Sequence, residues 1–298
     1  MADLDPRFTF DNFVVGPANR LASAAARRAA ESPGASYNPL FIYSASGLGK
    51  THILGAIAAQ VARAQPEASV EYQTLEAFLG ELTEALEGGE GVRSRYEGLD
   101  ILLMDDVQFL TGQAEAQEML LRTLDTLTGA GKQAVLASDR PPSEIDGLDS
   151  RLRTRFEGGL LVDIGPPEYE TRIAIVRKQA EARGQKLISG VAEVLGRISF
   201  KNVRELGGAL NRILAIQELE GRSVSPHEAS SLLGDRPGTE PPPDGTDLGR
   251  FLNELSDTVA AQVSAPPWHP NTPYRQIPSS PVSSHSPIQV PSQSGSSQ

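Results

Sequence analysis

The sequence predicts an α/β protein in which a parallel sheet, covered by helices on both faces, is followed by a small all-α domain. Three observations lead to this prediction. Short apolar runs alternate with segments of helical spacing up to about residue 165, a glycine-containing loop follows the first run, and the later patterns are helical throughout. Parallel sheets of this kind bind ligands at the carboxyl ends of their strands.

The expected strands are short apolar runs bounded by polar residues or glycine. They lie at 40–43, 70–73, 101–105, 134–138 and 160–164. Three helical patterns follow, at 168–183, 191–199 and 203–220. Gly184 and Gly221 are suited to end two of these helices.

Composition excludes several classes of protein. The 298 residues include no cysteine, which excludes disulfides and thiolate chemistry, and the four histidines show no metal-ligand spacing. A net charge of −11 argues against gripping duplex DNA by bulk charge. Because no apolar run could span a bilayer and the N-terminus does not resemble a signal peptide, we expect a cytoplasmic protein without membrane contact.

Composition also suggests where the chain is divided. We expect the α/β part to occupy residues 1–165 and the helical part 166–232. A Pro- and Gly-rich linker is expected at 233–246 and an isolated amphipathic helix at 247–263. The remainder, 264–298, is expected to be disordered, since half of the residues from Ala265 onward are Pro or Ser.

The loop after the first predicted strand has the sequence S-A-S-G-L-G-K-T and runs from Ser44 to Thr51. Its backbone N–H groups and the following helix N-terminus would form an anion site. Lys50 would contact β and γ phosphates, and the Thr51 hydroxyl would bind Mg²⁺. Ser44 stands where the usual pattern has glycine, which is costly if that position needs a positive φ. The alternative is an ordinary glycine turn with an accidental Lys-Thr.

A second motif supports a nucleotide site. The apolar run 101–105 ends in two adjacent carboxylates, Asp105 and Asp106. Asp105 would bind Mg²⁺, and Asp106 would orient or deprotonate the attacking water. Asp is also common at strand ends because it is favoured in the turns that follow. The two motifs together nevertheless indicate hydrolysis of a nucleoside triphosphate.

Five further segments occur in a characteristic order. They are FTFDNFVVG at 8–16, YNPLFIY at 37–43, DDVQFL at 105–110, SDRPP at 138–142 and NVREL at 202–206. Together they resemble the ATPase domain of the DnaA family of bacterial replication initiators, over about residues 5–221. The resemblance implies an AAA+ P-loop fold with a helical lid, ATP and Mg²⁺ as ligands, and slow, regulatory ATP hydrolysis.

The resemblance also assigns residues by position. Asp139 matches a sensor of the γ phosphate, Arg204 matches a lid arginine that contacts the nucleotide, and the segment from Asn12 to Gly16 matches the adenine contact. The residues expected to contact ATP are Asn12, Phe13, Val14, Gly16, Ser46, Gly47, Leu48, Gly49, Lys50, Thr51, His52, Asp139 and Arg204.

Arg155 matches the arginine finger that reaches a neighbouring subunit's nucleotide, and Arg151 matches a second basic residue of the same segment. A guanidinium near a γ phosphate makes charge-assisted contacts that ADP does not provide. The resemblance therefore implies ATP-dependent, head-to-tail self-association. Without it, Arg151, Arg153 and Arg155 would be interpreted as a solvated face and Arg204 as a surface salt bridge.

The chain departs from the family in its DNA-binding features. Because the match starts almost at the first residue, we expect the family's helicase-contacting domain to be absent, and we expect no helix-turn-helix domain in residues 222–298, which have few basic residues and little helical patterning. Gln113 and Glu115 replace basic residues expected to contact single-stranded DNA, which weakens that surface, although Leu79 suits it.

The leading hypothesis is a DnaA-like ATPase in replication initiation or its regulation, with the initiator or helicase machinery as partners. Two alternatives stay open. One is an Hda-like regulator of the initiator, although residues 1–10 show no clamp-binding peptide. The other is a nucleotide-gated assembly module without DNA contact, whose segment 247–263 recruits a partner.

Overall fold

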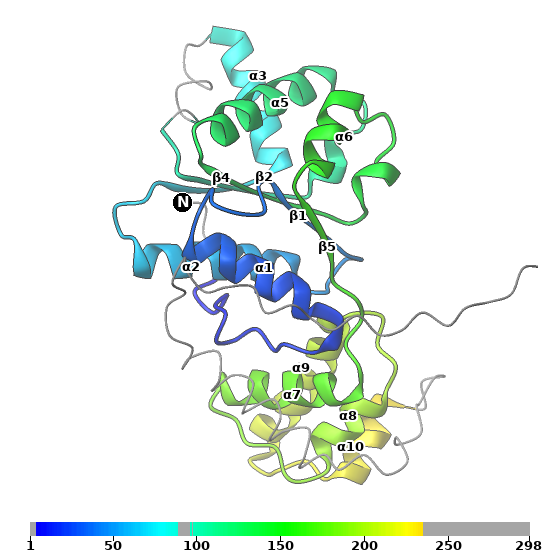
Figure 1. Cartoon of the computed structure of the whole chain (residues 1–298). Helices are drawn as coiled ribbons and strands as arrows, with labels where there is room; N and C mark the ends of the chain where they lie inside the picture. Colours follow the sequence, from blue (N-terminus) through cyan, green and yellow to red (C-terminus); the bar gives the residue numbers. More distant parts are fainter. Residues whose placement is uncertain (1–3, 89–95, 97, 235–298) are drawn as a thin grey trace, which may run out of the picture. The chain divides into compact units, whose positions relative to one another are not determined.

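The computed structural model describes residues 4–88, 96 and 98–234, and it confirms the α/β class. Within these residues, five strands form one parallel sheet in the order β2-β3-β4-β1-β5 (Figure 1). The strands are β1 (Leu40–Tyr43), β2 (Val70–Thr74), β3 (Ile101–Asp105), β4 (Gln133–Ser138) and β5 (Leu160–Asp163). Each predicted strand is present, with ends that agree to within a residue.

The strand register brings three strand ends to one edge of the sheet. Tyr43 at the end of β1 is paired with Ser138 at the end of β4. On the other side of β4, Met104 of β3 is paired with Leu136. The loops that follow β1, β3 and β4 therefore emerge side by side, although long stretches of sequence separate them.

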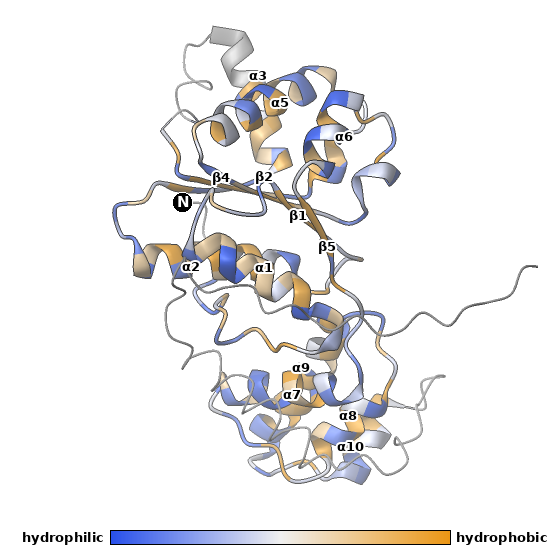
Figure 2. Cartoon of the chain, in the orientation of Figure 1, coloured by the Kyte–Doolittle hydropathy of each residue, from blue (hydrophilic) through white to orange (hydrophobic). Residues whose placement is uncertain are grey.

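Helices cover both faces of the sheet (Figure 1). One face carries α1 (Arg20–Glu31) and α2 (Lys50–Ala64), and the other carries α3 (Leu75–Gly88), α5 (Ala114–Gly129) and α6 (Ser150–Glu157). Alternate strand residues supply the two cores, because successive side chains of a strand point to opposite faces. Ile42 belongs to the α1–α2 core and Phe41 to the α3–α5–α6 core. The middle strands β3, β4 and β1 are accordingly mostly apolar (Figure 2), whereas β2 at one edge of the sheet also carries Glu71 and Gln73.

Short 3-10 turns connect several of these elements. They are η1 (Pro17–Asn19), η2 (Val107–Leu110) and η3 (Pro142–Glu144). The second follows β3 directly and carries the chain from the end of that strand toward α5.

The helical part has a core of its own. It consists of α7 (Tyr169–Glu181), α8 (Val191–Arg197), α9 (Val203–Glu220) and α10 (Pro226–Leu233). The first three correspond to predicted helices. The fourth starts within the predicted helical part, 166–232, but is not among the three helices predicted there. It begins with a capping box, in which Ser225 and Glu228 each bond the other's backbone N–H, and Pro226 occupies its first turn.

Two further expectations concern the chain's division and membranes. No helix in the described part of the chain is long and apolar enough to cross a bilayer. The predicted helix 247–263, the tail 264–298 and all of the linker beyond Gly234 lie outside the described residues, so these boundaries stay predictions.

Phe156 anchors α6 to the sheet and provides a test of this packing. Its side chain is fully buried, and its ring centroid lies 5.2 Å from that of Phe41 in β1. We expect Phe156→Ala to lower the free energy of unfolding by about 3–5 kcal/mol, because it removes buried surface and leaves a cavity. Urea unfolding measures this. Leu219→Ala, at an exposed position, is the control, and equal losses in both variants would contradict the packing.

Candidate functional site

The loop between β1 and α2 has the backbone geometry of an anion-binding turn. Gly47 and Gly49 have φ values of 81° and 110°, in the left-handed region that favours glycine. Among the described residues, the non-glycine residues with positive φ are Tyr37 and Asp106, so Ser44 is not strained. Its N–H donates to the Ser138 carbonyl at 3.1 Å, which continues the β1–β4 pairing. The serine at the usual glycine position therefore has no backbone cost.

Lys50 is the first residue of α2 and lies beneath this loop. Its side chain is buried, and its Nζ donates to the Ser44 carbonyl oxygen at 2.9 Å. Burial lowers the pKa of Lys50, while the charges of Asp105, Asp106 and Asp139 oppose this effect. Lys50 is thus a buried cation held among carboxylates, at the place where the loop turns into the helix.

Asp105, the last residue of β3, faces the same loop. It is 2% exposed, and its Oδ2 accepts a hydrogen bond of 2.6 Å from the Thr51 hydroxyl. Its Oδ1 accepts from the Asp106 N–H at 2.9 Å. Desolvation raises the pKa of Asp105, and the hydrogen bond from Thr51 partly offsets this. The two predicted metal-binding residues, 54 positions apart in sequence, therefore touch.

Tyr72 is a site residue that sequence reasoning missed. It lies in β2, and its hydroxyl donates to Asp105 Oδ2 at 3.4 Å. Burial, followed by the Asp105 charge, raises the pKa of Tyr72, so the phenol stays a proton donor. No sequence pattern marks Tyr72, because its role depends on β2 lying beside β3.

The oxygen atoms of Thr51 and Asp105 fit Mg²⁺. This ion binds proteins through one or two carboxylate or hydroxyl oxygens and takes its other ligands from phosphate and water. Within the described ranges, no three His, Cys, Asp or Glu side chains group closely enough to hold a metal by themselves. The pair therefore suits a magnesium ion shared with a bound phosphate better than a site made of protein ligands alone.

Asp106 and Asp139 are connected through Gln108. The Gln108 amide nitrogen donates to Asp106 Oδ1 at 2.9 Å, and its oxygen accepts from the Asp139 N–H at 3.1 Å. Asp106 has a φ of 59°, and Asp139 directly follows β4. The ion pair with Arg140 lowers the pKa of Asp139. Gln108, another residue that the motifs did not identify, thus joins the ends of β3 and β4.

A cavity of about 240 Å³ adjoins the loop. Several residues of the expected ATP contact set line it, namely Asn12, Phe13, Val14, Leu48, Gly49 and His52. The His52 ring lies 5.0 Å from that of Phe8 and 5.3 Å from that of Phe13. Since the Thr9 carbonyl only accepts, His52 Nε2 carries the proton in the 2.9 Å bond between them. Its lining combines these rings and aliphatic side chains with charged residues such as Asp5, Arg7 and Lys178, a mixture that suits a flat heterocyclic base with polar edges.

The lid contacts the loop at the start of α9. Val203 N–H donates to the Gly47 carbonyl at 3.1 Å, and Asn202 fills the space beside Gly47. Arg204 is exposed in the first turn of α9, and its charge acts on Lys50.

Two further residues of the expected contact set lie near the loop or the helical part. Gly16 packs against Thr171 of α7 so closely that a Cβ at position 16 would lie 2.2 Å from the Thr171 hydroxyl oxygen. Ser46 lies within the loop itself.

The α6 arginines are not part of this cluster. Arg155 is paired with Asp125 of α5, and Arg151 is paired with Glu118 and Asp149.

The residues expected to contact single-stranded DNA lie on α5 and α3. Gln113 and Glu115 are exposed at the start of α5, and Leu79 is half-buried on α3.

A model of the bacterial DnaA ATPase domain matches residues 4–163. The chain belongs to this family. DnaA of Thermus thermophilus is 47% identical over 234 residues, which are 78% of this chain and 54% of the relative. This DnaA-family chain thus spans about half the length of that relative.

Two solved DnaA structures are also similar. Domain III of DnaA from Thermotoga maritima has 41% identity and a TM-score of 0.74, and the match covers 80% of this chain and all of that one. A replication initiator DnaA bound to AMPPCP and single-stranded DNA has 37% identity and a TM-score of 0.66. That match covers 73% of this chain and 69% of the other.

His52 makes the stability of this DnaA-family chain depend on pH. Burial lowers its pKa below the ordinary value of 6.5. Between 6.5 and the folded pKa the unfolded chain binds more protons, so we expect the free energy of unfolding to fall as the pH decreases below 6.5. Urea unfolding of the wild type and His52→Gln at about pH 7.5 and about pH 5.5 measures this. An equal pH dependence in both proteins would contradict the assignment.

Proposed function

We propose that this chain binds ATP with Mg²⁺, hydrolyses it slowly, and uses the bound nucleotide to control head-to-tail self-association in replication initiation or its regulation. The observation that carries the proposal is the hydrogen bond between Thr51 at the start of α2 and Asp105 at the end of β3, with the buried Lys50 within reach of the Asp105 charge and a cavity beside the loop. The AMPPCP bound to a similar DnaA supports ATP as the ligand.

The residues have distinct roles in binding. The N–H groups of the loop and the N-terminus of α2 receive the phosphates, and Lys50 Nζ exchanges the Ser44 carbonyl for phosphate oxygens. Thr51 and Asp105 hold Mg²⁺, which when bound neutralises phosphate charge and polarises the phosphate oxygens. The base enters the cavity lined by Phe13, Val14 and His52.

Hydrolysis depends on Asp106, the carboxylate next to the proposed Mg²⁺-binding residue Asp105. Asp106 orients or deprotonates the attacking water, and Gln108 holds its carboxylate in position. The same Gln108 binds the backbone of Asp139, so the proposed γ-phosphate sensor moves together with the proposed base. Slow turnover suits a switch, because the ATP state must last long enough for subunits to assemble.

The lid and the α6 arginines relate the nucleotide to assembly. Arg204 reaches the phosphates from α9, whose first N–H is bonded to the phosphate loop. Arg155 acts on the nucleotide of a neighbouring subunit, where its guanidinium makes forked, charge-assisted contacts with a γ phosphate. Binding of ATP thereby strengthens the contact between subunits, and hydrolysis weakens it.

A specific observation favours assembly with little contact to DNA as the second candidate. Gln113 and Glu115 are exposed at the start of α5, where the resemblance expects basic residues. A carboxylate facing phosphate is repulsive. A similar DnaA binds single-stranded DNA, and we propose that the corresponding surface of this chain binds it weakly.

Variants of the phosphate site test ATP binding. We expect Lys50→Ala and Asp105→Ala to weaken binding of a fluorescent ATP analogue by about 10- to 100-fold, since the first loses a charge-assisted bond to the phosphates and the second loses a carboxylate of the Mg²⁺ site. ATPase assays should show a matching loss of turnover. Lys186→Ala and Asp163→Ala change exposed residues of the same types and serve as controls. The proposal fails if all four variants bind and hydrolyse ATP like the wild type.

Basic substitutions at the start of α5 test the proposed DNA surface. We expect Gln113→Lys combined with Glu115→Arg to bind labelled single-stranded DNA more tightly in the presence of ATP. Each added phosphate contact should also steepen the salt dependence by about 0.7 in logarithmic slope. Fluorescence anisotropy at several salt concentrations measures both effects. Glu67→Lys, at an exposed acidic residue elsewhere, is the control. A gain no larger than in this control would exclude the α5 N-terminus as the DNA contact.

A further inference from the structure

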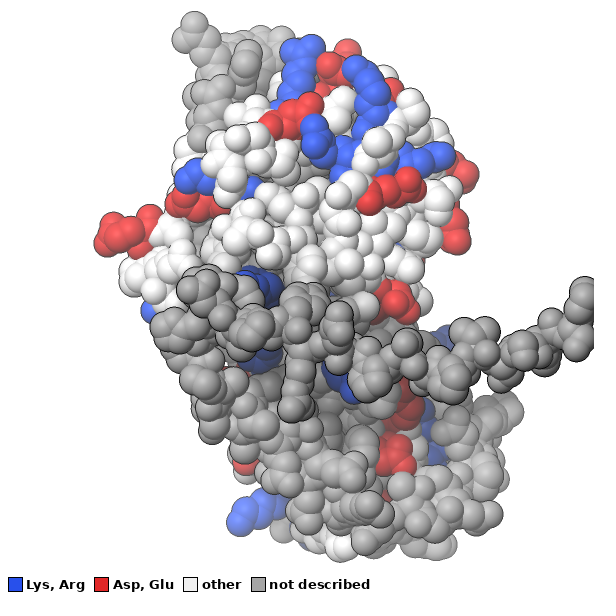
Figure 3. All heavy atoms as spheres, in the orientation of Figure 1, with Lys and Arg blue, Asp and Glu red and all other residues white. Residues whose placement is uncertain are grey.

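Two acidic residues of α5 hold the two arginines implicated in self-association. Glu118 pairs with Arg151, and Asp125 pairs with Arg155. We call these two pairs the α5–α6 ion-pair ladder. Glu118 and Asp125 are seven residues apart and Arg151 and Arg155 four apart, so each pair of residues shares one helix face. Figure 3 shows basic and acidic side chains interspersed over this part of the molecule.

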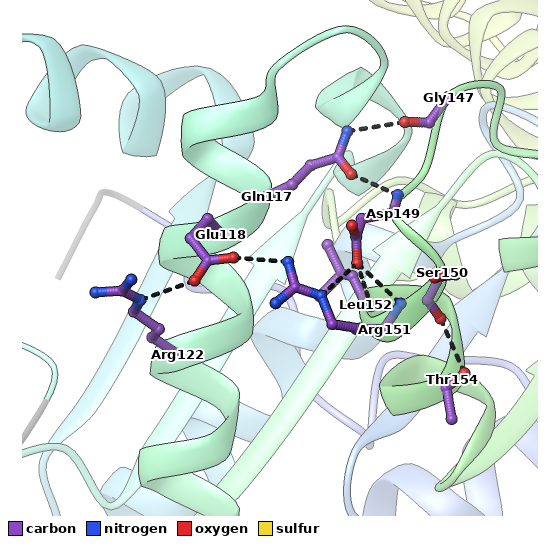
Figure 4. A network of polar contacts seen from close by, with 9 residues as sticks. All are labelled: Gln117, Glu118, Arg122, Gly147, Asp149, Ser150, Arg151, Leu152 and Thr154. Atoms are coloured by element: carbon purple, nitrogen blue, oxygen red, sulfur yellow. Dashed lines mark hydrogen bonds and ion pairs between the residues drawn. The ribbon is translucent and has the colours of Figure 1, made fainter.

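Arg151 is tied to its own subunit by several contacts (Figure 4). Its guanidinium bonds Glu118 at 2.9 Å and Asp149 at 3.2 Å. Asp149 is the N-cap of α6, and Glu118 also pairs with Arg122 at 3.0 Å. Both carboxylates that hold Arg151 therefore have further partners. To contact another subunit, the Arg151 guanidinium would have to leave both of them.

Gln117 reinforces the start of α6 from α5. It is 5% exposed, its amide nitrogen donates to the Gly147 carbonyl at 3.1 Å, and its oxygen accepts from the Asp149 N–H at 2.6 Å. These bonds fix the turn before α6 to α5 (Figure 4). The backbone at the start of α6 is therefore bonded to α5, and the side chain of Arg151, which is 63% exposed, is held there by its two ion pairs.

Arg155 is held differently. Within the described part of the chain, its ion pair is with Asp125, a single carboxylate. The side chains are 40% and 49% exposed, so water competes for both groups. Exposed pairs of this kind are weak. Arg155 can consequently be released by breaking one ion pair, whereas Arg151 has to leave both Glu118 and Asp149.

We propose that Asp125 is an intramolecular competitor for the Arg155 guanidinium, so that self-association requires Arg155 to exchange this carboxylate for a phosphate bound to a second copy of the chain. This inference rests on the proposed function of Arg155. Asp125 accepts a hydrogen bond from Nη2 of Arg155, so a γ phosphate that binds this guanidinium in a forked geometry through Nη2 must replace the carboxylate, and the doubly charged phosphate is the stronger acceptor. Asp125 therefore raises the protein concentration at which ATP drives assembly.

Removing the competitor while keeping its shape tests the proposal. We expect Asp125→Asn to lower the protein concentration of half-maximal assembly in ATP by about 1.5- to 5-fold, the range for one exposed ion pair. Sedimentation velocity of the full chain measures it. Asp125→Glu keeps the carboxylate and should remain near the wild-type value. Glu67→Gln makes the same charge change at an exposed residue elsewhere and should have no effect.

A double-mutant cycle separates direct competition from a general effect of charge. In an Arg155→Ala background, Asp125→Asn should leave assembly unchanged, because the group it competes for is gone. A gain of the same size in that background, or no gain in the single variant, overturns the inference. Thermal unfolding and ATP affinity should match the wild type in Asp125→Asn.

The cycle also distinguishes this inference from the proposed function. If Arg155→Ala assembles as the wild type does, the proposed role of Arg155 fails, and the inference fails with it. If Arg155→Ala loses assembly while Asp125→Asn assembles no better than the wild type, the inference alone fails.

Discussion

The hydrogen bond from the Thr51 hydroxyl to the buried Asp105 carboxylate is the contact on which the candidate site depends. A carboxylate that is 2% exposed is costly unless its oxygens are bonded, and Asp105 satisfies both by bonding Thr51 and the Asp106 N–H. This arrangement requires β1 and β3 to end at the same edge of the sheet. The order β3-β4-β1 achieves that and also brings Asp139 beside Lys50.

Charged side chains gather in two separate regions, one around the loop between β1 and α2 and the other over α5 and α6, and they are paired differently in the two. Around the loop, three carboxylates act on one buried lysine, and an ATP-bound magnesium ion would add the positive charge that this region lacks. Over α5 and α6, Arg151 and Arg155 are already paired with carboxylates of their own chain. In the proposed function, the first region receives the nucleotide directly, whereas Arg155 has to leave Asp125 before it contacts a neighbouring subunit.

The sequence predicted the strands well because the middle strands β1, β3 and β4 are buried on both faces and are therefore mostly apolar. It did not predict strand order, and so it missed Tyr72 and Gln108, whose roles depend on neighbours distant in sequence. The pairing of Asp125 with Arg155 was missed for the same reason. By contrast, α10 was missed although Ser225-Pro-His-Glu228 is a recognisable capping box. Strain at Ser44, expected if its φ were positive, does not occur.

Calorimetric titration of the full chain with ATP, with and without Mg²⁺, tests the central claim most directly. The account predicts one ATP site per chain and weaker binding when Mg²⁺ is removed, because Thr51 and Asp105 would then have no ion to share with the phosphates. Binding that is absent, or that is equally tight without Mg²⁺, would contradict it.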